Sequence, residues 1–214
     1  INNKMPKQQG QINSINLYLT TLCNYKCVGC CAHTQDKGSM TVDEIRSLAT
    51  KLGKVDTIIL TGGEPTLHKN FRDILAEILK LDYNKLVIQT NGFGLMKYID
   101  LWDNFDEIRI SHYDKKSYPN AQENTHIIEE FKSTYKGSAT ILQEDIVMIP
   151  HNNGRRNPCF RGSWEVASIW KDKVYGCCVG GGMDTAEGAE VDENWRTTAK
   201  QVELPCGLCP FATL

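Results

Sequence analysis

Residues 15–30 read INLYLTTLCNYKCVGC and join a strand-like segment to a cysteine-rich loop. The first six residues alternate apolar and mixed side chains, which predicts a β-strand. Cys23, Cys27 and Cys30 follow at once, so that a single loop can wrap several thiolates round one compact centre. Soft thiolate ligands favour zinc or an iron–sulfur cluster. The segment therefore predicts a metal centre in the loop after the first strand.

The metal in this loop has two interpretations. A zinc site requires four ligands, and Cys31 would have to be the fourth although it points away from the site that Cys30 enters. Three ligands fit a [4Fe–4S] cluster that keeps one iron open for a ligand from outside the protein. Buried cysteines that act as small hydrophobic residues are a further alternative. The spacing favours the iron–sulfur cluster.

Composition narrows the class of protein. The 214 residues include nine cysteines, and 24 Lys and Arg against 26 Asp and Glu give a net charge of -2. This balance indicates neither nucleic acid nor an anionic membrane as a partner, and no apolar run approaches the ~20 residues of a membrane span. Residues 1–11 are polar and lack the apolar core of a signal peptide. We therefore expect a cytoplasmic protein whose cysteines bind metal rather than form disulfides.

Strand-like and helix-like segments alternate over the first two thirds of the chain. After the strand at 15–20, strands are predicted at 57–60, 86–88, 107–111 and 139–149, with helices at 42–52, 71–79, 94–101 and 127–135 between them. Such alternation predicts an α/β fold with a parallel sheet. Right-handed crossovers place the carboxyl ends of all the strands at one rim, where sites in these folds lie.

Polar motifs follow the next three strands and therefore reach the same rim. They are Thr61-Gly62-Gly63-Glu64-Pro65, Gln89-Thr90-Asn91-Gly92 and Ser111-His112-Tyr113-Asp114. Two adjacent glycines let a ligand approach the backbone closely, and a carboxylate can bind an ammonium group. Each motif can also be read simply as a turn. Their shared position predicts polar side chains round one mouth.

Taken in this order, the three cysteines, Gly-Gly-Glu-Pro and Thr-Asn-Gly resemble the radical S-adenosylmethionine (radical SAM) superfamily over roughly residues 12–150. The resemblance implies a partial (β/α)6, TIM-like barrel. It implies that Cys23, Cys27 and Cys30 hold a [4Fe–4S] cluster whose open iron chelates SAM. The residues implied in SAM binding are Gly62, Gly63 and Glu64 at the methionine amino group, with Asn91 and Ser111 at the ribose or carboxylate.

The resemblance also implies an activity: reductive cleavage of SAM to a 5′-deoxyadenosyl radical that abstracts hydrogen from a substrate, with an electron donor such as flavodoxin or ferredoxin. The candidates for a general base, by position only, are His112, Tyr113, Asp114, Glu144 and Arg155. The sequence departs from the family at Gly29, where an aromatic residue is common. The family's glycine-rich motif on the fifth strand is not recognisable at 141–148, and five strands are clear where six are expected.

The C-terminal third carries the other cysteine cluster. Composition shifts at 150–156, which predicts domains at 12–150 and 151–214, the second with a hairpin round Lys171-Asp172 and a short helix at 195–202. The segment resembles the twitch domain, a short relative of the SPASM domain, and the resemblance implies a second, auxiliary [4Fe–4S] cluster. Its four ligands would be Cys159, Cys177, Cys206 and Cys209, with Cys178 possible in place of Cys177. A four-cysteine zinc ribbon is the alternative.

Two clusters favour a two-electron oxidation of a small molecule, in which the auxiliary cluster takes the second electron. Two other kinds of radical SAM enzyme are alternatives: a peptide-modifying enzyme, and a non-oxidative lyase, epimerase or cyclase. A non-enzymatic zinc-binding interaction module is the alternative from another class.

Overall fold

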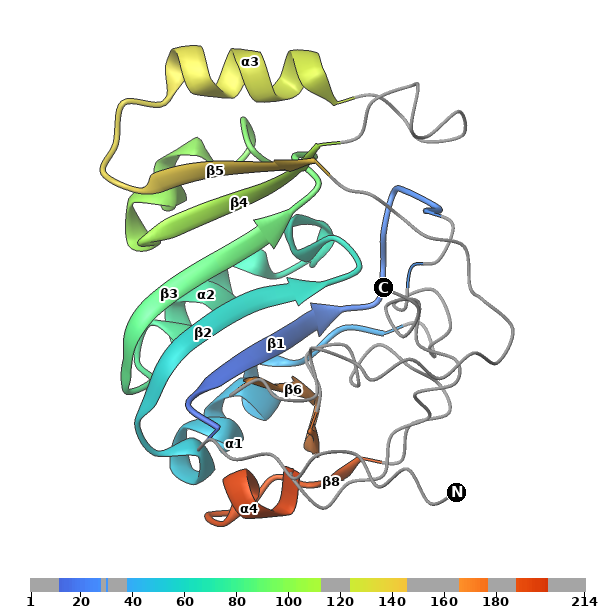
Figure 1. The fold of residues 1–214 in the computed structure, drawn as a ribbon, viewed down its shortest axis with the longest axis vertical. Helices are drawn as coiled ribbons and strands as arrows, with labels where there is room; N and C mark the ends of the chain where they lie inside the picture. The colour runs from blue at the N-terminus through green and yellow to red at the C-terminus, as the bar shows by residue number, and fades with distance from the viewer. Residues whose placement is uncertain are drawn as a thin grey trace, which may run out of the picture.

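The computed structural model describes residues 12–27, 30, 38–112, 124–145, 166–176 and 188–199 (Figure 1). The described strands form one sheet in the order β5-β4-β3-β2-β1-β6-β7-β8. The first five strands are β1 (Ser14–Thr20), β2 (Val55–Gly62), β3 (Tyr83–Thr90), β4 (Glu107–His112) and β5 (Thr140–Asp145). They pair in parallel with their sequence neighbours, which confirms the predicted parallel α/β sheet.

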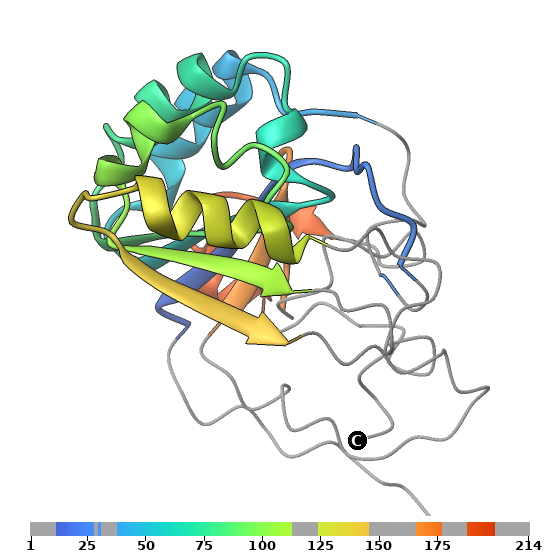
Figure 2. The same cartoon turned by 90° about the horizontal axis from the view of Figure 1, so that it is seen from above.

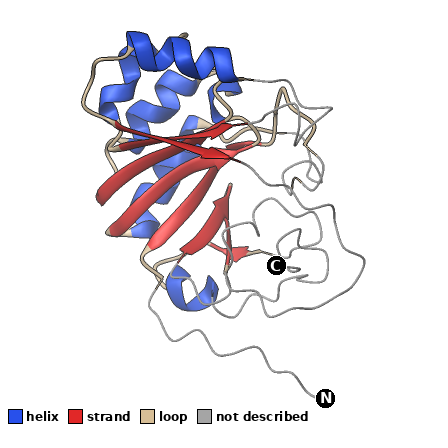
Figure 3. Ribbon diagram, turned by 45° about the horizontal axis from the view of Figure 1, so that its top comes forward, coloured by secondary structure: helices blue, strands red, loops and turns tan. Residues whose placement is uncertain are grey.

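The helices that connect these strands gather on one side of the curved sheet (Figures 2 and 3). They are α1 (Val42–Leu52), η2 (Pro65–Leu67), α2 (Phe71–Ile78), η3 (Ile99–Asn104) and α3 (Thr125–Thr134). Parallel strands linked by helices curve in this way in a partial barrel, with the strand carboxyl ends at one edge. The sheet is therefore consistent with the expected partial barrel.

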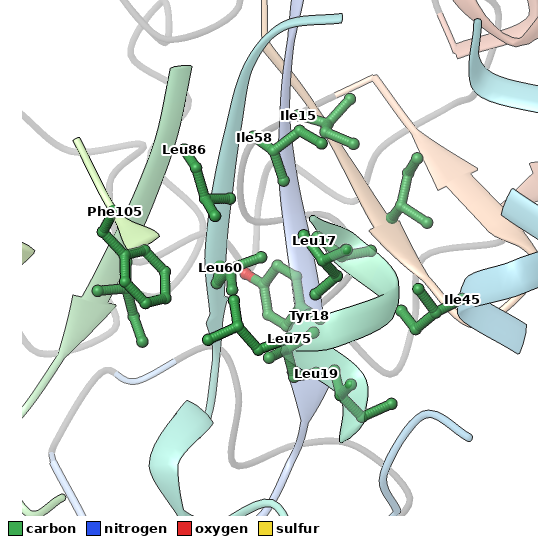
Figure 4. Packing of buried hydrophobic residues seen from close by; sticks show 14 of the residues in the cluster. Ile15, Leu17, Tyr18, Leu19, Ile45, Ile58, Leu60, Leu75, Leu86 and Phe105 are labelled. Atoms are coloured by element: carbon green, nitrogen blue, oxygen red, sulfur yellow. The ribbon is translucent and has the colours of Figure 1, made fainter. Parts of the chain in front are cut away.

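Alternation along the strands builds the core. Ile15, Leu17 and Leu19 of β1 are fully buried, and Figure 4 shows them packed with Ile45 of α1 and Leu75 of α2. Successive strand residues point to opposite faces, so the intervening positions face the other side of the sheet. Burial of this apolar face fixes the register of the strands.

The first helix is bounded as its sequence predicts. Thr41 accepts a hydrogen bond from the Glu44 backbone N–H, and the Glu44 side chain accepts one from the Thr41 N–H, which completes a capping box. Gly53 ends the helix with φ +57°, a left-handed conformation that glycine adopts without steric cost. Asn70 lies at the predicted start of α2, but its side chain makes no capping hydrogen bond.

The prediction of an α-helix at 94–101 is wrong. This segment forms hydrogen-bonded turns that lead into the 3₁₀ helix η3 at Ile99–Asn104. Trp102 is fully buried, and its indole N–H donates to the Leu95 carbonyl at 2.7 Å. The contact folds the segment back on itself, so tertiary packing of an aromatic residue overrides the helical pattern.

The C-terminal part joins the opposite edge of the sheet. It comprises β6 (Val166–Trp170), β7 (Lys173–Tyr175), β8 (Ala189–Glu190) and α4 (Trp195–Ala199). Strand β6 pairs in parallel with β1, and β7 pairs antiparallel with β6, as expected for a hairpin round residues 171–172. The hairpin of the predicted second domain thus continues the barrel sheet beyond β1. No helix in the described ranges is long and apolar enough to cross a membrane.

Candidate functional site

The cysteine loop lies at the carboxyl end of β1 and is closed at its base. Thr20 forms an isolated antiparallel bridge with Ser39, and its hydroxyl donates to the Gly38 carbonyl at 2.9 Å. The Met40 N–H donates to the Leu19 carbonyl at 2.8 Å. These bonds hold the two ends of the loop side by side at the end of the strand.

Within this loop the three predicted cluster ligands are half-buried, and none forms a disulfide. The Tyr25 N–H donates to the Cys23 sulfur at 3.3 Å, and the Cys30 N–H donates to the Cys27 carbonyl at 3.2 Å. Tyr25 is itself 5% exposed and anchors the middle of the loop in the protein. Backbone N–H groups of the loop therefore bond to the Cys23 sulfur and to the Cys27 carbonyl.

The loop after β2 packs directly against the base of the cysteine loop. The Gly63 N–H donates to the Thr20 carbonyl and the Glu64 N–H to the Leu22 carbonyl, each at 2.7 Å. A Cβ atom on Gly62 would overlap the Thr20 carbonyl oxygen, and one on Gly63 would overlap that of Leu22. The two glycines are therefore required for the approach of two protein loops to each other.

Glu64 is completely buried, and its carboxylate accepts four hydrogen bonds from the protein. Oε1 accepts from the Thr66 N–H at 3.1 Å, the Thr66 hydroxyl at 2.6 Å and the Thr90 hydroxyl at 2.7 Å, while Oε2 accepts from the Asn91 N–H at 2.7 Å. Burial raises the pKa of this carboxyl above its usual range, although the hydrogen bonds oppose the shift. The side chain therefore joins the ends of β2 and β3, a structural role that the sequence motif did not indicate.

Asn91, predicted to contact SAM, links the end of β3 to the cysteine loop. Its Nδ2 donates to the Asn24 Oδ1 at 2.9 Å and lies 3.7 Å from the Cys23 sulfur. Its Oδ1 accepts from the Phe93 N–H at 3.0 Å. The structure thus brings the third-strand motif into contact with the loop that carries the predicted cluster ligands.

The remaining predicted residues divide into two groups. Ser111 is buried at the end of β4, His112 Nε2 lies 2.9 Å from the Thr125 hydroxyl, and Glu144 on β5 is opposite Ser111 in the register. The others lie outside the described residues: Tyr113, Asp114, Arg155, Cys159, Cys177, Cys178, Cys206 and Cys209.

Sequence reasoning missed Asn124, which is fully buried at the start of α3. Its side-chain amide donates to the carbonyls of both Asn91 and Ser111, at 2.7 and 2.8 Å. The residue stands outside the strand-end motifs, and an asparagine before a helix is ordinarily read as a cap. The local sequence pattern therefore gives no sign that Asn124 contacts Asn91 and Ser111.

The thiols lie in an environment that disfavours their negative charge. Burial above all, with smaller contributions from the neighbouring Glu64, Cys30 and Cys27, raises the pKa of Cys23 to about 11, although the hydrogen bond from the Tyr25 N–H opposes the shift. Burial, Cys27 and Glu64 similarly raise the pKa of Tyr25 to about 12. A bound metal cation would offset this repulsion between thiolates, since metal ligation deprotonates a thiol outright.

The donor set fits an iron–sulfur cluster. No group of three or more His, Cys, Asp or Glu among the described residues converges on the position of a single metal ion. In a [4Fe–4S] cluster each thiolate binds a different iron atom, so the sulfurs need not meet at one point. Three thiols on one loop meet that requirement, and Cys27 and Cys30 lie near enough to Cys23 to raise its pKa.

Comparison with known proteins finds a family match over part of the chain. Residues 17–115 match the family model described as the Radical SAM superfamily. This range of the chain is similar to radical SAM domains. The matched range begins in β1 and ends just past β4, and it contains the cysteine loop, the glycine loop and the Asn91 motif.

Solved structures resemble this chain at low sequence identity. Native anSMEcpe with bound AdoMet is 20% identical, with 63% of this chain and 44% of that chain covered and a TM-score of 0.50. A histidine-tagged form of anSMEcpe with bound AdoMet is 18% identical over 63% and 43%, also with a TM-score of 0.50. Streptococcus suis SuiB bound to the precursor peptide SuiA is 12% identical over 94% and 70%, with a TM-score of 0.45. The chain spans less than half the length of anSMEcpe, and the likeness to anSMEcpe is one of fold.

Proposed function

We propose that this protein is a radical SAM enzyme in which Cys23, Cys27 and Cys30 hold a [4Fe–4S] cluster. The observation that carries the proposal is the hydrogen bonding of the cysteine loop to the loop of Gly62 and Gly63, both within the range that matches the Radical SAM family model. The solved structure of native anSMEcpe contains bound AdoMet, which supports SAM as the co-substrate. When bound, the cluster supplies the electron that cleaves SAM to methionine and a 5′-deoxyadenosyl radical, which abstracts hydrogen from the substrate.

The chain's own residues would bind and orient SAM. The backbone of Gly62, Gly63 and Glu64 lies beside the cysteine loop, where carbonyl oxygens can accept hydrogen bonds from the methionine amino group. Asn91 lies against Cys23 and Asn24, so its amide is placed next to the cluster position. Ser111, on the adjacent strand, is the second candidate for the ribose or the carboxylate. The buried Glu64 carboxylate would support this site by holding the Asn91 backbone N–H.

We further propose an auxiliary [4Fe–4S] cluster on Cys159, Cys177, Cys206 and Cys209, with Cys178 as the substitute for Cys177. Four protein ligands leave such a cluster no open iron, which suits electron transfer. The reaction would then be a two-electron oxidation of a small molecule. Hydrogen abstraction would remove the first electron and proton from the substrate. An auxiliary cluster on these cysteines would supply an acceptor for the second electron, and a protein base would take the second proton. His112 and Glu144 are the base candidates within the described residues.

Anaerobic reconstitution with iron and sulfide tests the proposal. Two [4Fe–4S] clusters correspond to about eight irons per chain, and the reduced protein should convert SAM to 5′-deoxyadenosine. Two zinc ions per chain with no SAM cleavage would support the zinc-binding interaction module and overturn the enzyme.

Single cysteine changes separate the two clusters. Cys27→Ala should remove about half of the iron and abolish SAM cleavage, because a cluster with three protein ligands cannot spare one. Cys31→Ala is the matched control and should retain both properties, since Cys31 is not among the proposed ligands. Cys206→Ala should also lose about half of the iron but keep SAM cleavage. Full iron content in Cys206→Ala would refute the auxiliary cluster alone.

A further inference from the structure

Asn124 occupies the N-cap position of α3 without capping that helix. Asparagine is among the preferred N-cap residues because its side chain can accept a hydrogen bond from the first turn. Here no side-chain capping bond is made, and the residue is 0% exposed. The side chain is turned away from its own helix and toward the sheet. The buried Asn124 amide makes no capping bond and is held by contacts outside its own helix.

Those contacts lie at the ends of β3 and β4. The last register pair between the two strands is Thr90 with Ile110, and one step further along stand Asn91 and Ser111. The Asn124 Nδ2 donates to the carbonyls of both, at 2.7 and 2.8 Å. The two N–H groups of one amide thus join the strand ends just beyond the ladder. Because one nitrogen atom bonds to both carbonyl oxygens, it limits how far Asn91 and Ser111 can move apart.

Asn91 is held from its other side as well. Its backbone N–H donates to the buried Glu64 carboxylate at 2.7 Å, while its carbonyl accepts from Asn124. The peptide groups on both sides of this residue are therefore fixed by side chains from two different elements. Gly92, which follows with φ +93°, has the Asn124 amide nitrogen 3.7 Å from the place of an added Cβ. The backbone at this corner has no freedom to shift alone.

We propose that Asn124 is a positioning residue of the SAM site, which sets the spacing and orientation of Asn91 and Ser111 at the rim. The inference rests on the proposed function, because these two residues are the proposed contacts to the ribose or the carboxylate. Asn124 donates to the backbone carbonyls of Asn91 and Ser111 and acts through them. The hydrogen-bond ladder between β3 and β4 ends at Thr90 and Ile110. Beyond it, a site built from Asn91 and Ser111 needs another link between the two strands.

Asn124→Asp tests the amide without changing the shape of the side chain. The variant replaces the donating nitrogen with an acceptor oxygen that faces two carbonyl oxygens, so the strand ends repel each other instead of being joined. SAM affinity of the reconstituted protein, measured by equilibrium dialysis, should fall on the order of tenfold or more. Iron content and the visible absorbance of the cluster should stay unchanged, because the cysteine loop is held by its own bonds.

The matched control is Asn104→Asp. The Asn104 side chain also donates to a carbonyl, that of Leu101 at 2.8 Å, but it is exposed on η3, and the control should bind SAM as the wild type does. Asn124→Ala serves if the aspartate variant does not fold, and it should weaken SAM binding without adding a charge. A second measurement reads the tie directly: amide hydrogen exchange of residues 91–93 in the metal-free chain should speed up in both Asn124 variants.

The outcomes separate the two proposals. Wild-type protein that assembles its cluster and binds no SAM overturns the proposed function, while the exchange experiment still reports on Asn124. Wild-type binding with equal affinity in Asn124→Asp overturns the positioning role. Loss of iron, SAM affinity and folding in parallel in both Asn124 variants also overturns it, since that pattern is expected of a residue that only stabilises the fold.

Discussion

Gly63 lies where the loop after β2 meets the loop after β1. Its sequence position indicates close approach of a ligand to the backbone, and the structure shows that the chain itself makes the first such approach. The Glu64 N–H reaches the Leu22 carbonyl at 2.7 Å only because Gly63 has no side chain to separate them. At this residue a ligand-binding motif and a packing requirement coincide.

Gly63→Ala should destabilise the protein and impair cluster assembly. The added methyl group would overlap the Leu22 carbonyl, a backbone atom that cannot rotate away, and overpacking of this kind costs about 1–3 kcal/mol. Urea unfolding measures the first effect, and iron content after reconstitution measures the second. Gly53→Ala is the control, because its Cβ would meet nothing within 4 Å and only the left-handed backbone, at about 1 kcal/mol, opposes it. Normal iron content in Gly63→Ala would contradict this account.

Glu64 is a second residue of this motif with a structural role, because its carboxylate accepts hydrogen bonds from the protein. Glu64→Ala leaves four donors at the ends of β2 and β3 without their acceptor, two of them backbone N–H groups. Each buried unsatisfied group costs about 1–3 kcal/mol, so the free energy of unfolding should fall by at least about 3 kcal/mol. Glu64→Gln keeps one acceptor oxygen and should fall between the wild type and Glu64→Ala. Urea unfolding ranks the three proteins, with the exposed Glu130→Ala as a neutral control.

At the scale of elements, His68 connects the end of η2 to Met40, where the chain leaves the cysteine loop and enters α1. Its Nε2–H donates to the Met40 carbonyl at 2.7 Å, and its Nδ1 accepts from the Asn70 N–H at 3.1 Å. These two bonds specify the neutral ring, because a proton on Nδ1 would face the Asn70 N–H. The ring is 2% exposed, and burial lowers the pKa of His68 below its usual value.

This arrangement predicts a pH-dependent stability. Above pH 6.5 the ring is neutral in both states, so folding carries no cost from its titration. Below that pH the unfolded chain binds a proton that the folded chain resists, and stability falls as the pH drops toward the folded pKa. Between pH 7.5 and 5.5 the wild type should therefore lose up to about 1 kcal/mol more than His68→Gln. Urea unfolding at both pH values checks this, with the exposed His126→Gln as control. The prediction is wrong if His68→Gln loses as much stability between pH 7.5 and 5.5 as the wild type does.

At the scale of the whole molecule, the C-terminal part is attached to the barrel at two places. Strand β6 pairs with β1 along the sheet edge, and α4 packs at the opposite rim from the cysteine loop. Trp195 of α4 is fully buried, and its indole N–H donates to the Leu52 carbonyl at 3.0 Å. Arg196 adds hydrogen bonds to the carbonyls of Ile12, Leu52 and Lys54. These contacts make the described C-terminal elements part of the same folded body.

Trp195→Ala should therefore loosen the attachment of α4 and destabilise the protein by about 3–5 kcal/mol, the usual cost of removing a buried aromatic side chain. Trp195→Phe keeps most of the ring, and Arg196 still donates to the Leu52 carbonyl at 3.3 Å, so its cost should be closer to about 1 kcal/mol. Thermal unfolding ranks the variants, and limited proteolysis should cut first near residue 195 in Trp195→Ala. Equal stability of the two variants would show that the ring's packing contributes little.

Local pattern was sufficient for much of the fold. Period-two and helical periodicities predicted the five parallel strands and the helix at 42–52, because backbone geometry and burial act there over a few residues. The cysteine spacing and the glycine motif likewise placed the candidate site at one rim. The helix at 94–101 was wrong because burial of Trp102, a tertiary contact, decides that segment.

The sequence by itself determined the parallel α/β class and the rim at which the cysteines and polar motifs gather. Only the tertiary structure decided that the Glu64 carboxylate is buried between two strand ends, that β6 adds to the β1 edge, and that Asn124 joins Asn91 to Ser111. Each of these depends on pairs of residues from 13 to more than 100 positions apart, such as Asn124 with Ser111 and β1 with β6. Periodicity reports which face a residue turns to the core, and it holds no information on which distant atom meets it there.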